Sequence, residues 1–338
     1  MRYEHVAIAG LSTALPEAEV TTEAIERMLA RSYQALGLRP GFLEGLTGVQ
    51  ARRFWEEGVM PSDAATRAAE RLLEETGFPR QELGVLVSTS VCKDFLEPSV
   101  ASLVHGNLGL AEACWNFDVG NACLGFVSGM AMVANMIELG QIGAGMVVAG
   151  EGSRDVTRST VQNLMKPGID FARLKDNLAT LTLGSGAAAM LLVRAGQGGH
   201  EHHLRGGVIK AATEFNRLCV GTATQMKTDP ARLLQEGVRL AQRTWAQVRT
   251  DLDLEAAQVA EYALHQVGKA NHDAVTSALE IPLERALRVY PELGNVGAAG
   301  VPLTLSQAVA RGRVLAGDTV ALMGIGSGLN CAMMVVDW

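Results

Sequence analysis

Three residues of this sequence have the side-chain types that covalent acyl transfer requires: Cys123, His265 and Asn295. Cys123 follows Gly120-Asn121-Ala122 at the head of an apolar helical stretch, and the positive end of a helix favours thiolate over thiol. His265 closes an apolar strand, and ligand sites of α/β proteins gather at the carboxyl ends of strands. Asn295 lies in a glycine-rich turn. Together they supply a nucleophile, a proton carrier and a polar donor.

Each of these residues, taken alone, also has an ordinary structural explanation. A cysteine is often a small buried core residue, a histidine can be a structural side chain, and an asparagine close to a glycine is typical of a turn or helix cap. The combination favours a site, because an internal repeat places the three at related positions. The other cysteines are interpreted as structural: Cys92, Cys114, Cys219 and Cys331.

The elements that must position these residues alternate between apolar strands and helices, which indicates an α/β layered fold. The uncharged stretch 119–137 is interpreted as a buried core helix, because its glycine, serine and asparagine residues are untypical of a membrane span. The strand candidates are residues 5–10, 84–91, 115–119, 145–149, 180–193, 262–267, 319–325 and 331–336.

The repeat consists of a Gly-Asn pair followed by a helix, a turn, an apolar strand and a glycine-rich end. Gly120-Asn121 leads in this order to Gly150-Glu151-Gly152-Ser153. Gly294-Asn295 leads to Gly324-Ile325-Gly326-Ser327, at an offset of 174 residues at both ends. The sequence therefore predicts a duplicated α/β unit.

The predicted halves are residues 1–196, with the nucleophilic cysteine, and residues 205–338, with the histidine and asparagine. The stretch 195–203 is rich in glycine and polar residues and is interpreted as their linker. Small residues at the two equivalent helix starts, such as Gly125 and Gly300, are expected to let two buried helices pack back to back.

Several segments together resemble the thiolase-superfamily condensing enzymes of the β-ketoacyl-ACP synthase III type. These are Asn121–Phe126, His265-Gln266 and Gly294–Pro302, with Thr47–Arg53 similar to that family's early turn. Their order and spacing span nearly the whole chain. The resemblance implies a five-layered αβαβα thiolase fold built from two duplicated halves, and an obligate homodimer.

The resemblance also implies roles for the site residues. Cys123 would take the acyl group from a thioester, while His265 and Asn295 hold the enolate oxygen of the second substrate. The backbone N–H of Cys123 and one from the Gly326-Ser327 turn would form the oxyanion hole. One departure is Ser185, where relatives commonly have an aspartate between two glycines. That position is structural, so we expect that serine in place of aspartate leaves the catalytic chemistry unchanged.

Glu97 bears on which condensation is catalysed. Two fatty acyl thioesters joined head to head need a base to remove an α-proton, whereas a malonyl substrate forms its carbanion by losing CO2. Phe95 and Leu96 precede Glu97, and apolar surroundings would raise its pKa towards that of a useful base. Its charge would also repel a malonyl carboxylate. From composition alone, a solvated loop acid is the more ordinary interpretation.

The segments Lys93–Ser99 and Gly324–Cys331 look most like the OleA branch of the superfamily. This resemblance implies a non-decarboxylative Claisen condensation of two fatty acyl-CoAs to a 2-alkyl-3-ketoacid through an acyl-cysteine, in long-chain olefin biosynthesis. It also implies that Glu97 reaches into the neighbouring subunit's site. One alternative is a decarboxylating β-ketoacyl-ACP synthase III that uses acyl-CoA and malonyl-ACP. Another is a non-catalytic binding partner, which has no need for a nucleophile.

Composition and charge exclude several classes of protein. The chain has 338 residues, of which 48% are hydrophobic and 19% charged, as in a globular protein. A net charge of −7 argues against nucleic acid as a partner. The N-terminal apolar run is too short for a signal peptide, and the 5 cysteines lack CxxC spacing. We expect a cytoplasmic protein without a transmembrane segment.

Acyl-CoA is expected as substrate, and neither a cofactor nor a metal is expected. The spacing of His200, His202 and His203 fits no closed zinc site. The loop at 324–328 follows neither the dinucleotide pattern nor that of serine hydrolases. Arg52 and Arg53 are candidates for contact with a CoA phosphate, and downstream pathway enzymes are candidate partners.

Overall fold

The computed structural model describes residues 1–196, 202–222 and 226–338. Most strands belong to one large mixed sheet, and the short ones form small ribbons. The strands of the large sheet are β1 (Val6–Ala14), β4 (Val85–Ser88), β5 (Trp115–Asp118), β6 (Ala144–Glu151), β7 (Gly186–Arg194), β8 (His202–Ala211), β11 (Val259–Leu264), β12 (Thr319–Gly326) and β13 (Asn330–Asp337). The ribbons pair β2 (Glu19–Thr21) with β3 (Ala51–Arg53), and β9 (Cys219–Gly221) with β10 (Met226–Thr228).

Two groups of helices surround the sheet, and short 3-10 turns connect them to it. The helices packed on the sheet are α4 (Pro61–Thr76), α5 (Val100–Leu108), α6 (Gly125–Glu138), α9 (Pro230–Leu252), α10 (Lys269–Ala278) and α12 (Gly300–Ala310). The others are α1 (Thr22–Met28), α2 (Ala30–Leu36), α3 (Phe42–Thr47), α7 (Arg154–Leu164), α8 (Phe171–Asn177) and α11 (Tyr290–Leu293). The turns that matter for the site are η2 (Ala122–Leu124), η3 (Thr180–Thr182) and η7 (Gly297–Ala299).

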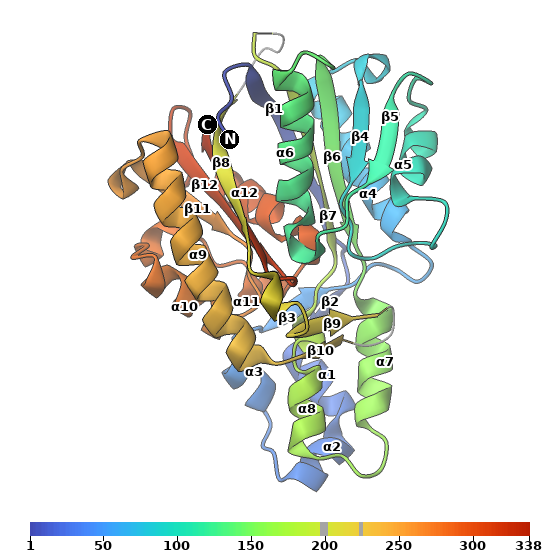
Figure 1. Cartoon of the computed structure of the whole chain (residues 1–338). Coiled ribbons are helices and arrows are strands. Elements are labelled where there is room, and N and C mark those ends of the chain that lie inside the picture. Colours follow the sequence, from blue (N-terminus) through green and yellow to red (C-terminus); the bar gives the residue numbers. More distant parts are fainter. Residues whose placement is uncertain (197–201, 223–225) are drawn as a thin grey trace.

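The large sheet is made of two parts that meet at a narrow junction. Its strand order is β11-β12-β13-β8-β1-β7-β6-β4-β5. In the described part of the chain, β1 and β8 pair at Ala7 with His203 and at Ile8 with His202. In Figure 1, α6 and α12 lie in the middle of the molecule, with α9 and α10 on one side and α4 and α5 on the other.

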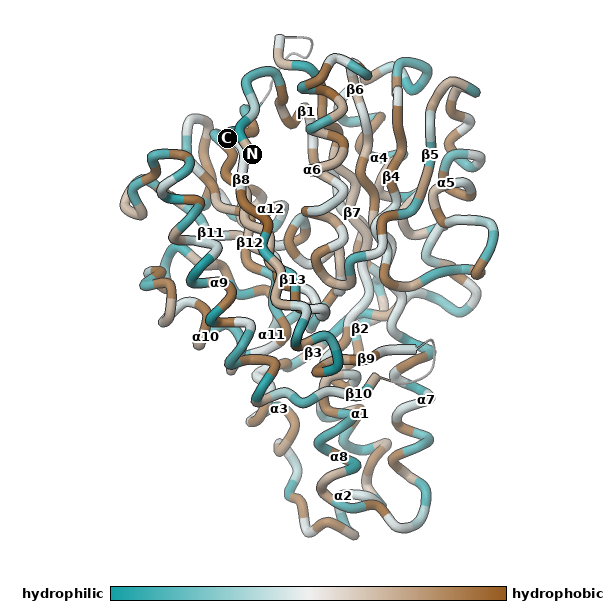
Figure 2. The backbone as a smooth tube through the Cα atoms, viewed as in Figure 1, coloured by the Kyte–Doolittle hydropathy of each residue, from teal (hydrophilic) through white to brown (hydrophobic). Residues whose placement is uncertain are grey.

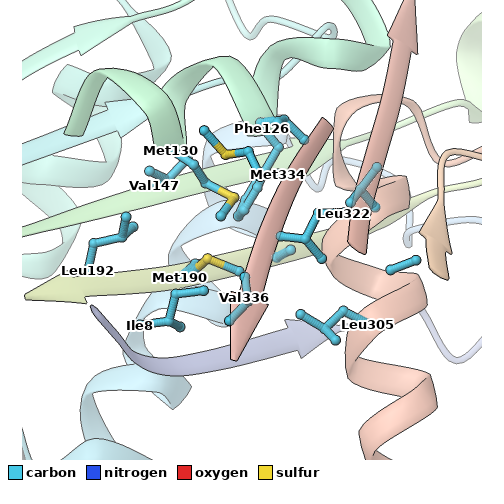
Figure 3. Packing of buried hydrophobic residues seen from close by; sticks show 14 of the residues in the cluster. Ile8, Phe126, Met130, Val147, Met190, Leu192, Leu305, Leu322, Met334 and Val336 are labelled. Atoms are coloured by element: carbon cyan, nitrogen blue, oxygen red, sulfur yellow. The ribbon is translucent and has the colours of Figure 1, made fainter. Parts of the chain in front are cut away.

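The hydrophobic clusters confirm the five-layered αβαβα arrangement. The central cluster combines residues of α6 and α12 with strands of both sheet parts, as in the packing of Phe126, Leu305 and Met334 in Figure 3. A second cluster joins α4 and α5 to the outer face of one part, and a third joins α9 and α10 to the outer face of the other. The layers are therefore helix, strand, helix, strand, helix.

Strands buried on both faces explain why the sequence shows continuous apolar runs rather than polar alternation. All residues of β6 are buried. Val147 belongs to the central cluster and Met146 to the outer one, because successive strand residues point to opposite faces. The surface helix α9 is instead amphipathic: Leu240, Thr244 and Val248 are buried, and Figure 2 shows hydrophilic and hydrophobic residues alternating along it.

The strand order supports the duplication. The order β4-β6-β7-β1 on one side is matched by β11-β12-β13-β8 on the other, and α6 and α12 are each followed by the corresponding strand, β6 or β12. We propose that the second half begins with β8 at His202, which places the start earlier than the predicted residue 205. The predicted linker therefore overlaps this strand at His202 and His203, and its residues 197–201 lie outside the described part of the chain.

The structure adds one strand to the predicted set and shortens another. Strand β8 (His202–Ala211) is not among the strand candidates of the sequence analysis, and it contains Gly206 and Gly207. A Cβ on Gly207 would lie 2.2 Å from the Met333 carbonyl oxygen, so close strand packing explains the glycine. The predicted strand 180–193 begins only at Gly186, because Thr180–Thr182 form η3.

A helical lobe containing α1, α2, α7 and α8 projects from one end of the sheet (Figure 1). Its own apolar cluster includes Leu29 and Leu164. Inside it, the buried Glu26 carboxylate accepts hydrogen bonds from the Tyr33 hydroxyl and the backbone N–H groups of Gly41 and Leu43. Among the described helices, none is both long and apolar enough to cross a bilayer.

Candidate active site

Cys123 lies on a tight turn that links β5 to α6. Ala122, just before it, has a φ of 46°, a left-handed conformation that is strained for any residue with a Cβ. The side chain of Asn121 holds the turn from both sides: its Oδ1 accepts from Asn330 Nδ2 at 2.9 Å, and its Nδ2 donates to Ser128 Oγ at 2.9 Å. The backbone thus presents Cys123 on a strained turn that neighbouring side chains stabilise.

The thiol of Cys123 is protonated at neutral pH. Its burial, reinforced by the negative charge of Glu151, raises its pKa to about 12. The expectation that a helix start favours the thiolate is therefore wrong in direction. The cysteine lies in η2, before the first turn of α6, and desolvation by its surroundings outweighs the helix dipole.

His265 directly follows β11, at the carboxyl end of a parallel strand pair as predicted. Its backbone N–H donates to the Met323 carbonyl in β12 at 2.8 Å. Burial lowers the pKa of the imidazole to about 4, so the ring is neutral at pH 7. Within the described residues, its buried Nδ1 has no hydrogen-bond partner.

The first residue of α12 determines how this imidazole is placed. A Cβ on Gly300 would lie 3.0 Å from His265 Nδ1, so the ring packs against the start of the helix. The positive helix end disfavours a proton on Nδ1, so we expect the single proton of the neutral ring on Nε2. In that tautomer His265 donates a hydrogen bond through Nε2.

Asn295 is held at both its backbone and its side chain. Its N–H donates to the Thr182 carbonyl and its carbonyl accepts from the Gly184 N–H, both at 2.8 Å. The Gly297 N–H donates to Asn295 Oδ1 at 3.0 Å. With Oδ1 occupied in this way, the side-chain amide has Nδ2 left to donate to a ligand.

The turns that carry these residues pack against one another. η2 contacts both η7 and β12. A Cβ on Gly326 would lie 2.9 Å from the Asn121 carbonyl oxygen, so the Gly326-Ser327 turn lies directly against the Cys123 turn. The structure therefore brings together the segments of Cys123, His265, Asn295 and Gly326, which lie far apart in the sequence.

The glycines at the helix starts serve a different purpose from the one predicted. A Cβ on Gly125 would lie 2.6 Å from the Thr89 carbonyl oxygen, and one on Gly300 would press on His265 rather than on α6. The expectation that these glycines allow helix-to-helix contact is wrong. They make room for a strand end and for the imidazole.

Glu97 does not join this group within one chain. It lies in the loop between β4 and α5 and is exposed. The Ser62 N–H and hydroxyl donate to the Asp94 carboxylate, and Lys93 Nζ donates to Asp118, which holds this part of the loop against the body. The residues before Glu97 are exposed too, with Leu96 at 101%. The predicted apolar surroundings of Glu97 are not formed by its own chain.

Glu151 is a site residue that the sequence reasoning missed. It ends β6 and is only 3% exposed. Its Oε1 accepts from the N–H groups of Val91 at 2.9 Å and Ala298 at 3.0 Å, and its Oε2 from the N–H of Cys92 at 3.2 Å. Burial raises its pKa. The signal was an acid at a strand's carboxyl end, within the repeat motif itself.

The two arginines proposed for CoA have different surroundings. Arg52 is 1% exposed and donates to Thr22 Oγ1 and the Leu181 carbonyl, each at 2.9 Å. Burial lowers its pKa to about 10. It therefore stabilises the interior instead of facing a soluble phosphate, and the prediction is wrong for Arg52. Arg53 is half-buried and donates to the Pro16 carbonyl.

Ser185 has a structural position, as expected. Its hydroxyl accepts from the Ser153 N–H at 3.0 Å and lies 3.1 Å from the Ser153 hydroxyl. Of the three histidines considered for a metal, His200 lies outside the described residues, and the His202 ring stacks on Trp338. In the ranges that the structure describes, no group of three metal-ligating side chains is assembled.

Comparisons with known proteins give one consistent family. Residues 117–205 match the family model of 3-oxoacyl-[acyl-carrier-protein] synthase III, and residues 250–338 match the model of its C-terminal part. The acyl-CoA:acyl-CoA alkyltransferase of Xanthomonas campestris is 39% identical over 338 residues, covering 100% of both chains. The Shewanella oneidensis protein of the same name is 38% identical over 350 residues, again with 100% of both covered.

Solved structures agree with these relatives. Cerulenin-bound OleA of Xanthomonas campestris superposes with a TM-score of 0.97 and 39% identity, covering 100% of this chain and 98% of that chain. Other structures of the same protein, with the same TM-score, carry a substitution of a glutamate, a cysteine or a histidine. Those three positions have the same separations along that chain as Glu97, Cys123 and His265 have here.

Proposed function

The chain belongs to the 3-oxoacyl-ACP synthase III family of thiolase-fold condensing enzymes, and from this premise we propose that it condenses two fatty acyl-CoA molecules head to head. The product is a 2-alkyl-3-ketoacid, for long-chain olefin biosynthesis. The observation that carries the proposal is the packing of the Cys123, His265 and Asn295 turns against one another. The names of the full-length relatives support the choice of substrate.

In the first step, Cys123 Sγ attacks the carbonyl carbon of an acyl-CoA. The backbone N–H groups of Cys123 and of the Gly326-Ser327 turn stabilise the oxyanion. The C–S bond to CoA breaks, and the proton of the Cys123 thiol passes to the departing CoA sulfur. The products are an acyl-cysteine and free CoA, so no cofactor takes part.

In the second step, Glu97 of the partner subunit removes an α-proton from a second acyl-CoA. The enolate oxygen accepts hydrogen bonds from His265 Nε2 and Asn295 Nδ2. The α-carbon then attacks the acyl-cysteine carbonyl, and the bond between this carbonyl carbon and Cys123 Sγ breaks. The Cys123 sulfur takes up the α-proton that Glu97 removed and becomes a thiol again. Hydrolysis of the remaining CoA thioester by water gives the β-keto acid.

This scheme requires a homodimer, and the exposed edge of the sheet supports one. β5 is the last strand in the order, and its Trp115 is 61% exposed. The neighbouring loop exposes Phe95 and Leu96. An unpaired edge strand beside exposed apolar side chains is suited to pairing with a second copy. Docking at this edge would also bring Glu97 towards the partner. We place the dimer in the cytoplasm, with downstream pathway enzymes as further partners.

The test uses the purified protein with one long-chain acyl-CoA and no malonyl donor, and follows CoA release and product mass. A β-keto acid built from two acyl chains, or the ketone formed when it loses CO2, supports the proposal. CoA release that stops at one equivalent per site until malonyl-ACP is added indicates the decarboxylating alternative. Failure of Cys123 to become acylated indicates a binding protein.

A further inference from the structure

Glu151 connects three segments that belong to different parts of the chain. Its carboxylate accepts from the N–H groups of Val91 and Cys92, which lie in the loop that continues to Glu97. It also accepts from Ala298 in η7, the turn that follows Asn295. Its backbone lies at the end of β6 and accepts from Trp55 Nε1 at 2.9 Å. One buried side chain thus joins the Asn295 turn to the start of the Glu97 loop.

The fit around this carboxylate is close. A Cβ on Gly297, which has a φ of 53°, would lie 2.9 Å from the Glu151 side-chain carboxyl carbon. Only glycine allows both this backbone conformation and this approach. The η7 turn is therefore seated directly on the carboxylate, and a displacement of Glu151 must move the turn that holds Asn295.

The internal repeat indicates that the acid is not a requirement of the fold. Glu151 in Gly150-Glu151-Gly152-Ser153 corresponds to Ile325 in Gly324-Ile325-Gly326-Ser327. Both residues end equivalent strands, β6 and β12. The half with the nucleophile has the carboxylate, whereas the half with the histidine has an apolar side chain. If an acid at this strand end served only the architecture of the fold, both halves would be expected to carry one.

We propose that Glu151 is a positioning residue for condensation: it holds the Asn295 turn of its own site together with the loop whose Glu97 acts in the partner's site, and it places a carboxylate near the Cys123 thiol. Its oxygens are occupied by backbone donors, so it acts through these segments and not as the base. The inference rests on the roles proposed above for Cys123, Asn295 and Glu97.

The charge has a measurable consequence for Cys123. Burial raises the pKa of this thiol most, and Glu151 and the nearby Cys219 raise it further. Cys92 lies close enough to interact with both Cys123 and Glu151. The imidazole of His265 is neutral, whereas the three backbone N–H donors of Glu151 favour its ionised form against the effect of burial on its pKa. Removing that charge should lower the pKa of Cys123, and the thiolate fraction at a given pH rises about tenfold for each unit.

The experiment compares Glu151→Gln and Glu151→Asp with the wild-type enzyme. The rate of Cys123 alkylation by iodoacetamide is measured against pH, with a Cys123→Ala sample for background, and condensation is measured with one long-chain acyl-CoA. Glu151→Gln should shift the alkylation profile to lower pH and reduce condensation at least tenfold. Glu151→Asp keeps the charge but withdraws it from the N–H groups, so its profile should stay near wild type while condensation falls.

Glu26→Gln is the matched control, because Glu26 is another buried carboxylate that accepts from two backbone N–H groups, and it lies in the helical lobe, whose apolar cluster is separate from the central one. It should change neither the alkylation profile nor the ratio of condensation to acylation. The proposal would be overturned if Glu151→Gln left the alkylation profile unshifted. It would also be overturned if Glu151→Gln and Glu151→Asp both catalysed condensation as fast as Glu26→Gln. Absence of any head-to-head product from the wild-type enzyme would instead refute the proposed function, since the alkylation profiles do not depend on that product.

Discussion

At the scale of single residues, Cys123 and His265 are both uncharged in the folded chain. Burial and Glu151 keep Cys123 a thiol, and burial keeps His265 a neutral imidazole. A neutral ring whose Nδ1 faces a helix start donates through Nε2, which suits an enolate oxygen. A protonated thiol is also less reactive towards oxidants and alkylating agents than a thiolate. The site is thus organised for hydrogen bonding in the second step.

Substitution of Glu97 separates the two proposed steps. Glu97→Gln keeps the size of the side chain but removes its basicity, so acylation of Cys123 should remain at the wild-type rate while condensation falls at least 100-fold. Mass spectrometry of the acyl-enzyme and of the product measures each step. The exposed Glu57→Gln is the control and should leave both unchanged. Equal loss of both steps in Glu97→Gln would contradict the base role.

The lowered pKa of His265 predicts a dependence of stability on pH. The folded state holds the ring at a pKa of about 4, below its usual 6.5, so the unfolded chain takes up the proton first as the pH falls. This contribution to stability is complete above pH 6.5 and is lost between about 6.5 and 4, by about 3 kcal/mol at most. Urea unfolding at several pH values measures it.

A His265→Asn variant provides the comparison for this measurement. It cannot titrate in this range, so its stability should fall less steeply between the same pH values. The difference between the two curves isolates His265 from the other buried groups, including His272, whose pKa is also lowered by burial. Parallel curves would show that His265 does not contribute.

At the scale of elements, the site is assembled from strand ends and helix starts. Cys123 follows β5, His265 follows β11, Glu151 ends β6 and Gly326 ends β12. In open α/β sheets, ligand sites form where parallel strands end. The duplication brings two such ends together, because α6 and α12 lie side by side between the two sheet parts. Cys123 then lies just before the start of α6, and Asn295 lies shortly before the start of α12.

Gly300→Ala tests whether the start of α12 sets the imidazole position. The new Cβ would lie 3.0 Å from His265 Nδ1, so the ring must shift. Condensation should fall about tenfold or more, because misplaced donors stabilise the enolate poorly, while acylation of Cys123 continues. Gly45→Ala in α3 introduces a Cβ with no atom within 4 Å and should be neutral. Wild-type condensation by Gly300→Ala would contradict this account.

At the scale of the whole molecule, the chain offers an incomplete site and an unpaired sheet edge. The described chain encloses Cys123, His265 and Asn295, but its Glu97 is exposed beside β5. Both features are explained if a second copy pairs at β5 and each subunit lends its glutamate to the other. Activity should then belong to the dimer, and a monomer should stop at the acyl-cysteine.

Mixing two inactive variants tests this exchange. Cys123→Ala lacks the nucleophile and Glu97→Gln lacks the base, but in a mixed dimer one site combines the intact Cys123 of one subunit with the intact Glu97 of the other. After unfolding and refolding together in equal amounts, the mixture should recover roughly a quarter of wild-type condensation, since half of the dimers are mixed and each has one complete site. Samples refolded separately are the controls. No recovery, despite mixed dimers on native mass spectrometry, would place Glu97 in its own subunit's site.

The sequence by itself determined the α/β class, the duplicated order of elements and the three residues that the structure places on neighbouring turns. Local patterns carry this information. Apolar runs predict strands buried on both faces, and the Gly-Asn pairs mark where each half turns from strand to helix. The resemblance of short motifs to known condensing enzymes then predicted roles for Cys123, His265 and Asn295.

Only the tertiary structure decided the protonation of the site and the contacts of Glu151. A pKa depends on burial and on charges brought close by folding, so the helix start at Cys123 predicted the wrong direction. The three N–H groups that hold Glu151 come from segments as distant as Val91 and Ala298. Strand β8 escaped prediction for the same reason, because its glycines are required by neighbouring strands that no local window contains.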